Sequence, residues 1–198
     1  MQTKEVREAI LDATDALLSQ NGYQKMTIDD LAAMVGIGKG SIYLHFRSKE
    51  EVVLSHIDRI IERLKGELTE IAALEISAEE RLKKMLVKRV LFRFDSVQHY
   101  TKSLNDLLSA VRPNLLTRRE NYFAEEARIF ASVIKEGEKS EVFETDDALK
   151  TAENLLLATN SLLPYSLTTQ ELGERIEIEE KVLQLANLLL KGLISRNE

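Results

Sequence analysis

Apolar residues recur every three or four positions along almost the whole chain of 198 residues, and polar residues occupy the positions between them. In the first segment, for example, Val6, Ile10, Ala13 and Leu17 form one apolar stripe. This period is that of an amphipathic α-helix. No segment shows the sustained alternation of apolar and polar residues that a half-buried β-strand requires. The pattern therefore predicts an all-α protein with about nine helices.

The first part of the chain is predicted to contain three short helices. Gly22 should end the first helix, because glycine adopts the left-handed conformation after a helix without steric cost. Thr27 should cap the second helix, which runs to about Met34 and carries aspartates in its first turn. The third helix is expected over about residues 39–46.

Longer amphipathic helices are predicted for the rest of the chain. Ser48 and Ser77 are each followed three residues later by a glutamate, which is the spacing of a capping box at a helix start. Pro113 suits the first turn of a helix, and Pro164 a helix kink or end. The helices expected from Ser48 onward cover about residues 48–73, 77–96, 98–111, 113–138, 145–167 and 177–195.

Composition narrows the class of protein. With 27 Lys and Arg against 33 Asp and Glu, the net charge of −6 argues against nonspecific coating of nucleic acid. The 0 Cys exclude a disulfide framework and fit a reducing cytoplasm, and no apolar run approaches the length of about 20 residues that spans a membrane. The 3 His lack metal-ligand spacing, and neither a phosphate-binding loop nor a nucleophile elbow is present. We therefore expect no metal, no cofactor, no membrane and no enzymatic activity.

The second and third predicted helices, joined by a tight glycine-containing turn, have the organisation of a helix-turn-helix. In that motif the later helix enters the major groove and reads bases with its N-terminal residues, which here are Lys39, Gly40 and Ser41. Residues 36–49 carry three cationic side chains and no acidic one, within a chain whose net charge is −6. Such a local positive charge is where contacts to DNA phosphates are expected.

The stretch 36–51, GIGKGSIYLHFRSKEE, closely resembles the signature of the TetR family of bacterial transcriptional regulators. That signature consists of a glycine-containing turn, a Ser or Thr, a Tyr within an aromatic pair, and a Ser-Lys-Glu-Glu start of the fourth helix. Gly22-Tyr23 and Thr27-Ile28 also match. The resemblance is strong over about residues 5–55, whereas the rest of the chain matches only in length and helical pattern.

The resemblance implies a DNA-binding domain over residues 1–47 and a ligand-binding and dimerisation domain over residues 48–198. It also implies a cytoplasmic, dimeric repressor that a small molecule releases from a pseudo-palindromic operator. Two alternatives remain open: a helical carrier or enzyme that does not bind DNA, and an activator with the same DNA-binding domain. The residues expected to contact DNA are Thr27, Gly38, Lys39, Gly40, Ser41, Tyr43, His45 and Lys49.

These DNA-binding candidates divide by the part of DNA they would contact. Thr27, Tyr43, His45 and Lys49 match positions that contact phosphates, whereas residues 39–41 match positions near base edges. Each also has a plain structural interpretation: Thr27 can be only a helix cap. Tyr43 can be a core aromatic, and the lysines can be solvated surface charges.

The helices expected at about 146–167 and 177–195 are apolar on more than one face. One apolar stripe can pack in the chain's own core, and the excess favours a homodimer in which both helices pair with their copies as a four-helix bundle. The alternative is a central helix buried within the monomer.

The helices between about residues 50 and 140 are expected to enclose the small-molecule ligand. Arg89 and Arg93 lie one helical turn apart and could bind an anionic ligand, although pairing with nearby acidic residues is the alternative. The ligand-binding candidates are polar or aromatic residues within otherwise apolar faces: Arg89, Phe92, Arg93, His99, Tyr100, Asn105, Asn121, Tyr122, Asn160 and Tyr165.

Overall fold

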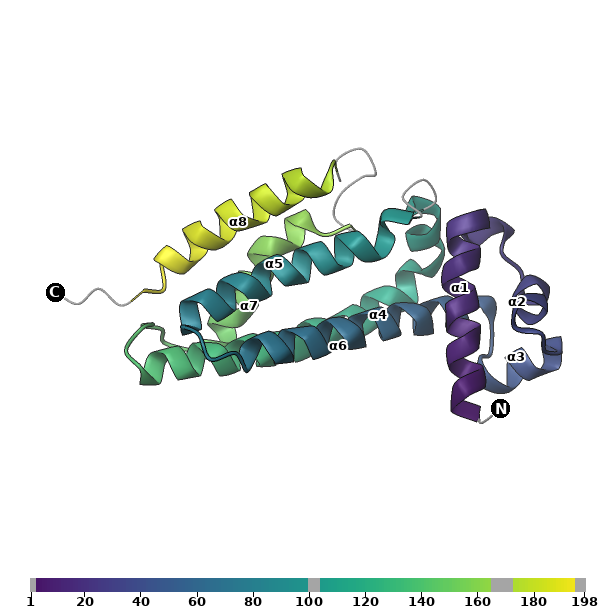
Figure 1. Cartoon of the computed structure of the whole chain (residues 1–198), viewed down its shortest axis with the longest axis horizontal. Helices are drawn as coiled ribbons and strands as arrows, with labels where there is room; N and C mark the ends of the chain where they lie inside the picture. Colours follow the sequence, from purple (N-terminus) through teal and green to yellow (C-terminus); the bar gives the residue numbers. More distant parts are fainter. Residues whose placement is uncertain (1–2, 100–103, 165–172, 195–198) are drawn as a thin grey trace. The chain divides into compact units, whose positions relative to one another are not determined.

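The computed structural model describes residues 3–99, 104–164 and 173–194. These residues form eight α-helices and a short 3₁₀-helix, with only one isolated β-bridge and no strand (Figure 1). The all-α prediction is therefore confirmed, and the expected number of about nine helices is close. No helix in this part of the chain is both long and apolar enough to cross a membrane.

The chain divides into two compact units. The first contains Met1–Ile61 and Val97–Thr117, and the second contains Glu62–Ser96 and Arg118–Glu198. The units differ from the division expected at residue 47, because the first part of the fourth helix belongs to the same unit as the three N-terminal helices. The functional division into residues 1–47 and 48–198 stays a prediction.

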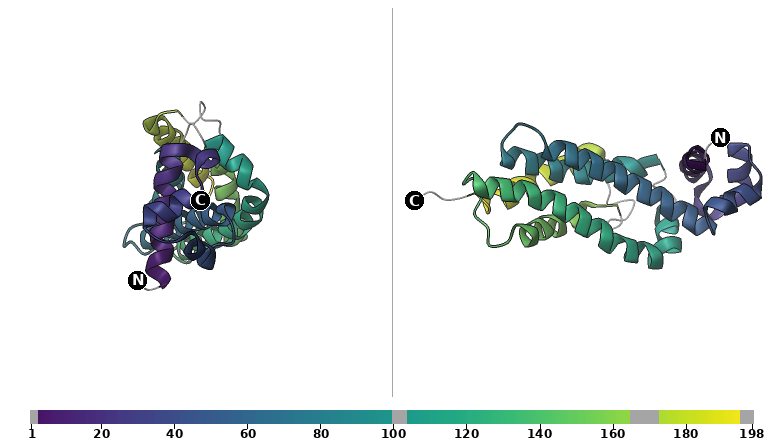
Figure 2. Two further views of the ribbon diagram at one scale, coloured as in Figure 1. Left: turned by 90° about the vertical axis from the view of Figure 1, so that its right-hand side faces the viewer. Right: turned by 90° about the horizontal axis from the view of Figure 1, so that it is seen from below.

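The first unit contains three complete helices. These are α1 (Thr3–Lys25), α2 (Ile28–Val35) and α3 (Lys39–His45). Figures 1 and 2 show the two short helices α2 and α3 beside α1. Gly22 does not end α1 as expected: it interrupts the helix with a non-helical φ of 71° and ψ of 167°, and one further turn follows. The positive φ is one that glycine readily adopts, but the ψ differs from that of the left-handed helical conformation expected at a helix end, and the chain kinks at Gly22.

Apolar side chains of α1, α2 and α3 form the core of the first unit together with the start of α4 (Lys49–Ala72). The buried apolar residues of α1 repeat at helical spacing, as their pattern predicts. Charged side chains add contacts between α4 and α1: Arg59 Nη1 lies 2.7 Å from Asp12 Oδ1 and 3.1 Å from Glu8 Oε2. His56, which is buried, lies with its Nε2 3.4 Å from Asp15 Oδ1.

The second unit contains two complete α-helices, α7 (Ala148–Thr159) and α8 (Arg175–Lys191), and parts of three others. The three are α5 (Ala78–Val97), without its last residue, and the later residues of α4 and of α6 (Leu104–Lys139). The buried stripe of α8 repeats every four residues: Ile178, Val182, Ala186 and Leu190. Ala186 and Leu190 belong to a core that also includes Leu64, Leu82, Phe130 and Leu156.

A close contact fixes the turn that follows α6. The ring of Phe143 lies directly against Gly137, where a β-carbon would come within 2.1 Å of a ring atom. Phe143 is buried and forms an isolated antiparallel bridge with Ile194. Gly137 therefore provides the space that the aromatic ring fills.

Three expected helix boundaries are wrong. The break expected before Pro113 does not occur, because the proline lies inside α6. Proline removes its own N–H from the helix ladder and crowds the carbonyl of the residue four positions earlier. Pro113 is exposed, so water can satisfy the carbonyl left without a donor. The helix expected to reach residue 167 ends at Thr159, and the last helix ends at Lys191 rather than Ser195.

Candidate functional site

A three-residue turn joins α2 to α3. Gly36 adopts a left-handed φ of 74°, and its N–H donates to the carbonyl of Ala33 at 3.2 Å. The N–H of Ile37 donates to the carbonyl of Ala32 at 3.0 Å. These bonds satisfy the last carbonyls of α2 and set the direction of α3, as glycine does at helix C-termini. The two helices form the helix-turn-helix that the sequence predicts.

Thr27 begins α2 with a complete capping box. Its Oγ1 accepts from the backbone N–H of Asp30 at 3.1 Å, and the Asp30 carboxylate accepts from the Thr27 backbone N–H at 3.0 Å. The Thr27 hydroxyl also donates to that carboxylate at 2.7 Å. The expected capping role of Thr27 is confirmed, while its contact with a phosphate stays a prediction.

Helix α3 has one buried side and one open side. Ile42 is fully buried against the core of the first unit, and Phe46 follows it into that core. On the open side, the side chain of Tyr43 is 50% exposed and that of Leu44 is 84% exposed. Leu44 was absent from the sequence-based candidates. The sequence does contain a signal for Leu44. It is an apolar residue of the expected recognition helix that lies next to Tyr43 and outside the apolar repeat that buries Ile42.

The first turn of α3 carries Lys39, which faces an acidic neighbour. Lys39 Nζ lies 2.8 Å from Asp29 Oδ2, and both side chains are at least half exposed. The hydrogen bond from Lys39 to Asp29 raises the pKa of the lysine above its usual value. Such an exposed ion pair is weak, so Lys39 can exchange the carboxylate for another anion.

Lys49 connects the start of α4 to the end of α1. Its Nζ donates to the carbonyls of Tyr23 at 3.0 Å and Met26 at 3.1 Å, and lies 4.2 Å from the centroid of the Tyr23 ring. Burial raises the pKa of the Tyr23 phenol. Lys49 therefore has a structural role in addition to the phosphate contact predicted from the sequence. Two of its three N–H groups serve this structural role.

The remaining DNA-binding candidates are the smaller groups of the motif. Gly38 caps α3 and Gly40 lies in its first turn, and at both positions no described atom comes within 4 Å of where a β-carbon would stand. Ser41 and His45 are half-buried on the same helix. The structure thus places six of the eight candidates on α3 or at its cap, with Thr27 at the start of α2 and Lys49 at the start of α4.

The ligand-binding candidates do not form one group. Arg89, Arg93 and Asn160 meet in the second unit, as described next. Of the others, Phe92 packs against the core of the same unit and Tyr122 is half-buried, whereas the exposed candidates are His99, Asn105 and Asn121. Tyr100 and Tyr165 lie outside the described residues. The expectation of one pocket lined by all these residues stays a prediction.

A buried charge cluster joins α5, α6 and α7. Arg89 Nε donates to Glu126 Oε2 at 2.7 Å, and Arg93 Nη2 donates to Glu126 Oε1. Arg89 also donates to Thr159 Oγ1 at 3.0 Å and to Asn160 Oδ1 at 2.8 Å. The pairing of both arginines with an acidic residue, which the sequence left as an alternative, is therefore what the structure shows.

In this buried cluster the two arginines outweigh the effect of burial on the Glu126 carboxyl. Glu126 is 0% exposed and Arg89 is 1% exposed. Burial by itself would raise the pKa of the Glu126 carboxyl, but the charges of Arg93 and Arg89 and the hydrogen bonds from them hold that pKa below its usual value. Glu126 is therefore ionised at neutral pH and compensates one of the two guanidinium charges.

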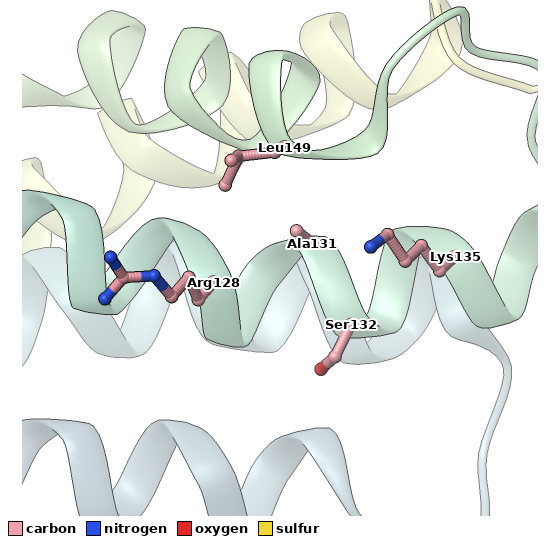
Figure 3. Close-up of a pocket in the computed structure, with 5 residues that line it drawn as sticks. All are labelled: Arg128, Ala131, Ser132, Lys135 and Leu149. Atoms are coloured by element: carbon pink, nitrogen blue, oxygen red, sulfur yellow. The ribbon is translucent and has the colours of Figure 1, made fainter.

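A shallow pocket of about 210 Å³ lies between α6 and α7 (Figure 3). Leu149 of α7 faces Ala131 of α6, and the cationic side chains of Arg128 and Lys135 lie on either side. Ser132 completes the lining. None of the sequence-based ligand candidates belongs to this pocket.

Comparison with known proteins identifies the helix-turn-helix. Residues 10–55 match the family model described as bacterial regulatory proteins, tetR family. The chain is 30% identical over 83 residues to the fatty acid metabolism regulator protein of Bacillus subtilis, an alignment that covers 40% of this chain and 41% of that protein. It is 24% identical over 192 residues to the HTH-type transcriptional repressor KstR2 of Rhodococcus jostii, covering 96% of this chain and 91% of that one.

Solved structures share the whole fold. A transcriptional regulator from Cytophaga hutchinsonii superimposes with a TM-score of 0.79 and 24% identity, covering 95% of this chain and 98% of that chain. A TetR transcription regulator from Haloarcula marismortui gives a TM-score of 0.76 with 19% identity, covering 97% of this chain and 100% of that chain. The family match falls on α1 to α4, where the helix-turn-helix geometry is described above. Residues 10–55 therefore match the TetR family of bacterial regulatory proteins, and the chain as a whole shares its fold with solved transcriptional regulators.

Proposed function

We propose that this DNA-binding transcriptional regulator acts in the bacterial cytoplasm as a homodimeric repressor. Each protomer places α3 in the major groove of one half of a pseudo-palindromic operator, and a small ligand releases the dimer. The observation that carries the proposal is the open side of α3, where Lys39, Gly40, Tyr43 and Leu44 are exposed while Ile42 holds the helix to its core. A helix held on one side and open on the other is what groove insertion requires.

The two glycines of α3 support close approach to DNA. The space around Gly38 and Gly40 would admit a β-carbon, so the protein's own packing does not require glycine there. A DNA surface would require it, because a side chain at either position would separate the helix backbone from the groove. We therefore expect Gly40→Ala to leave the melting temperature nearly unchanged and to weaken operator binding.

The exposed side chains divide between base reading and phosphate contact. Leu44 offers an apolar surface suited to the methyl group of thymine, which lies in the major groove. Lys39 can exchange Asp29 for a guanine edge or a phosphate, and the Tyr43 phenol can donate to a phosphate oxygen. His45 and the third N–H of Lys49 complete the proposed phosphate contacts.

An apolar surface on α7 and α8 supports the homodimer. In α8 the stripe from Ile178 to Leu190 is buried, yet Ile176 and Leu188 on the same helix are 67% and 69% exposed. Leu157 of α7 is 58% exposed. We propose that these residues pair with their copies in a four-helix bundle, so that one dimer presents two α3 helices. Reading of successive major grooves requires these helices to lie about 34–36 Å apart.

Ligand release is proposed to act through α4. This helix begins with Lys49 beside α1 and continues into the second unit, so one continuous helix belongs to both units. A ligand that binds one position of α4 more tightly than the other would shift the population of dimers away from the operator-binding form. Among the relatives, the fatty acid metabolism regulator of Bacillus subtilis and the transcriptional repressor of Rhodococcus jostii support a role in transcriptional repression.

Selection of genomic fragments tests the proposal. Purified full-length protein is incubated with sheared bacterial DNA at near-physiological salt, and the retained fragments are sequenced. We expect a recurring pseudo-palindrome, with two half-sites about one helical turn apart. Retention of no DNA, or of all DNA alike, would contradict sequence-specific regulation. With the operator in hand, Lys39→Ala should relax specificity, because the exposed pair of Lys39 with Asp29 is weak and leaves the ammonium able to contact a base.

A further inference from the structure

The second unit buries more positive than negative charge in one cluster. Arg89 and Arg93 supply two guanidinium groups, and Glu126 supplies one carboxylate. Both Glu126 oxygens are used, because Oε2 accepts from Arg89 and Oε1 from Arg93. The three groups therefore carry a net charge of +1 in an environment where an uncompensated charge is costly.

Arg89 is satisfied by its surroundings. Its Nε donates to Glu126, its Nη1 to Thr159 Oγ1 and to the carbonyl of Leu156 at 3.3 Å, and its Nη2 to Asn160 Oδ1. These acceptors hold the guanidinium at the C-terminal end of α7, where a cation also compensates the helix dipole. Nothing further is needed to explain why Arg89 is buried.

Arg93 is not satisfied in the same way. Its Nη2 donates to Glu126, but its Nη1 is buried and has no hydrogen-bond partner among the described residues. The residue as a whole is 9% exposed. A buried guanidinium nitrogen without an acceptor costs stability, and in native proteins such a group is commonly completed by water, an ion or a ligand.

We propose that Arg93 anchors a buried ligand site that receives the carboxylate of a monoanionic, otherwise apolar small molecule. The proposal rests on the ligand-responsive function above and specifies the chemistry of the effector. One negative charge balances the +1 of the cluster, whereas a phosphate dianion would exceed it. The planar guanidinium and a planar carboxylate also match in geometry, since each presents two parallel hydrogen-bonding groups.

The residues near Arg93 in sequence are apolar, which favours an apolar body for the proposed ligand. On α5, Val90 and Phe94 flank Arg93 in sequence and are buried, and Phe92 packs against the apolar core of the unit. Glu126 is the positioning residue of this site: it holds Arg93 through Nη2 and leaves Nη1 available. A ligand with a second charged group would have to bury that group among apolar side chains, which is unfavourable.

The first test uses the smallest possible probe. Thermal unfolding of the full-length protein is measured in sodium acetate and in sodium chloride at equal ionic strength. Acetate should raise the melting temperature more than chloride does, and Arg93→Gln should abolish this difference. Lys84→Gln removes an exposed cation from the same helix and is the matched control, in which the difference should persist. If acetate and chloride change the melting temperature equally, the protein does not prefer a carboxylate to an inorganic anion, and the proposal is overturned.

The second test adds the apolar body. Isothermal titration compares decanoate with methyl decanoate, which has the same chain but no charge. We expect decanoate to bind more tightly than its ester by about tenfold or more, from a charge-assisted hydrogen bond in a buried site. Arg93→Gln should remove this preference and Lys84→Gln should keep it. Equal binding of acid and ester, or acid binding that survives Arg93→Gln, would overturn the proposal.

Operator binding separates failure of this proposal from failure of the proposed function. Arg93→Gln protein should still select the same operator, because α3 is unchanged, but decanoate should no longer release it. If the wild-type protein selects an operator, but acetate and decanoate do not change operator binding in a way that depends on Arg93, the carboxylate site is wrong. The proposed repressor function would then still be supported. If neither protein selects any sequence, the proposed function itself is wrong, and the titrations still decide the carboxylate site.

Discussion

The ion pairs beside the two candidate sites, one in each unit of this protein, differ in their exposure to solvent. In the first unit, Lys39 pairs with Asp29 in the open, and Arg59 reaches Asp12 and Glu8, which are themselves at the surface. In the second unit, Glu126 and Arg89 pair with almost no exposure. Exposed pairs contribute little stability and change partners readily, whereas buried pairs are fixed and costly to break. The first arrangement suits contact with DNA, and the second suits recognition of a single small anion.

Removal of the Glu126 charge should have the largest effect on stability. Glu126→Gln leaves two guanidinium groups buried without their shared carboxylate, and we expect a loss of about 3–5 kcal/mol in the free energy of unfolding. Urea denaturation followed by circular dichroism measures it. The matched exposed variant is Asp29→Asn, which should change the urea midpoint little. A similar loss in both variants would remove the contrast between the units.

The next largest effect on stability is expected from replacing glycine at a tightly packed position and at an open one. Gly137→Ala would force a methyl group into the Phe143 ring, and we expect a loss of about 1–3 kcal/mol. Gly66 lies within α4 with no described atom within 4 Å of a β-carbon position, so Gly66→Ala should instead stabilise by up to about 1 kcal/mol. Thermal unfolding of the two variants compares them, and opposite signs are the expected result.

Lys49 tests whether a side chain of the first unit can serve both fold and DNA. Lys49→Ala removes two charge-assisted hydrogen bonds to backbone carbonyls, and we expect a loss of about 1–2 kcal/mol. Operator affinity should fall equally for all sequences, and the slope of log affinity against log salt should fall by about one. An unchanged salt slope with a lowered melting temperature would show that Lys49 is purely structural.

The smallest expected effect concerns Asp15 and the acid stability of the first unit. A hydrogen bond from His56, aided by the charges of His56 and Arg59, outweighs partial burial and lowers the pKa of the Asp15 carboxyl from 3.8. Because the folded pKa lies below the unfolded one, the ionised carboxylate contributes stability above pH 3.8, and this is lost as pH falls through the folded pKa. Asp15→Asn should therefore flatten the acid side of the plot of melting temperature against pH. An unchanged acid side would contradict this role.

Sequence reasoning was most successful where the signal is local. The cap at Thr27, the turn at Gly36 and the helix start after Ser48 each depend on residues within four positions, and the structure has all three. It failed where packing with other parts of the chain determines the structure. Pro113 was expected at a helix start, but an exposed proline within a long packed helix is tolerated.

The charge cluster illustrates the limit for contacts between distant residues. Arg89 and Arg93 were identified because they lie one turn apart, but their shared partner Glu126 is one of many glutamates in the chain. Only the packing of α5 against α6 brings it to both arginines. Helical spacing specifies which face a residue occupies, and it does not specify which residue of another helix it meets.

The position of Arg89 at the end of α7 has a consequence for how the protein should behave at different concentrations. Its contacts with the Leu156 carbonyl, Thr159 and Asn160 join the charge cluster to a helix that also exposes Leu157 to a second protomer in the proposed dimer. If an anion on Arg93 alters those contacts, it alters self-association as well, and linkage makes the effect reciprocal. Effector affinity would then depend on the total amount of regulator, so its abundance in the cell would itself set the sensitivity of the response.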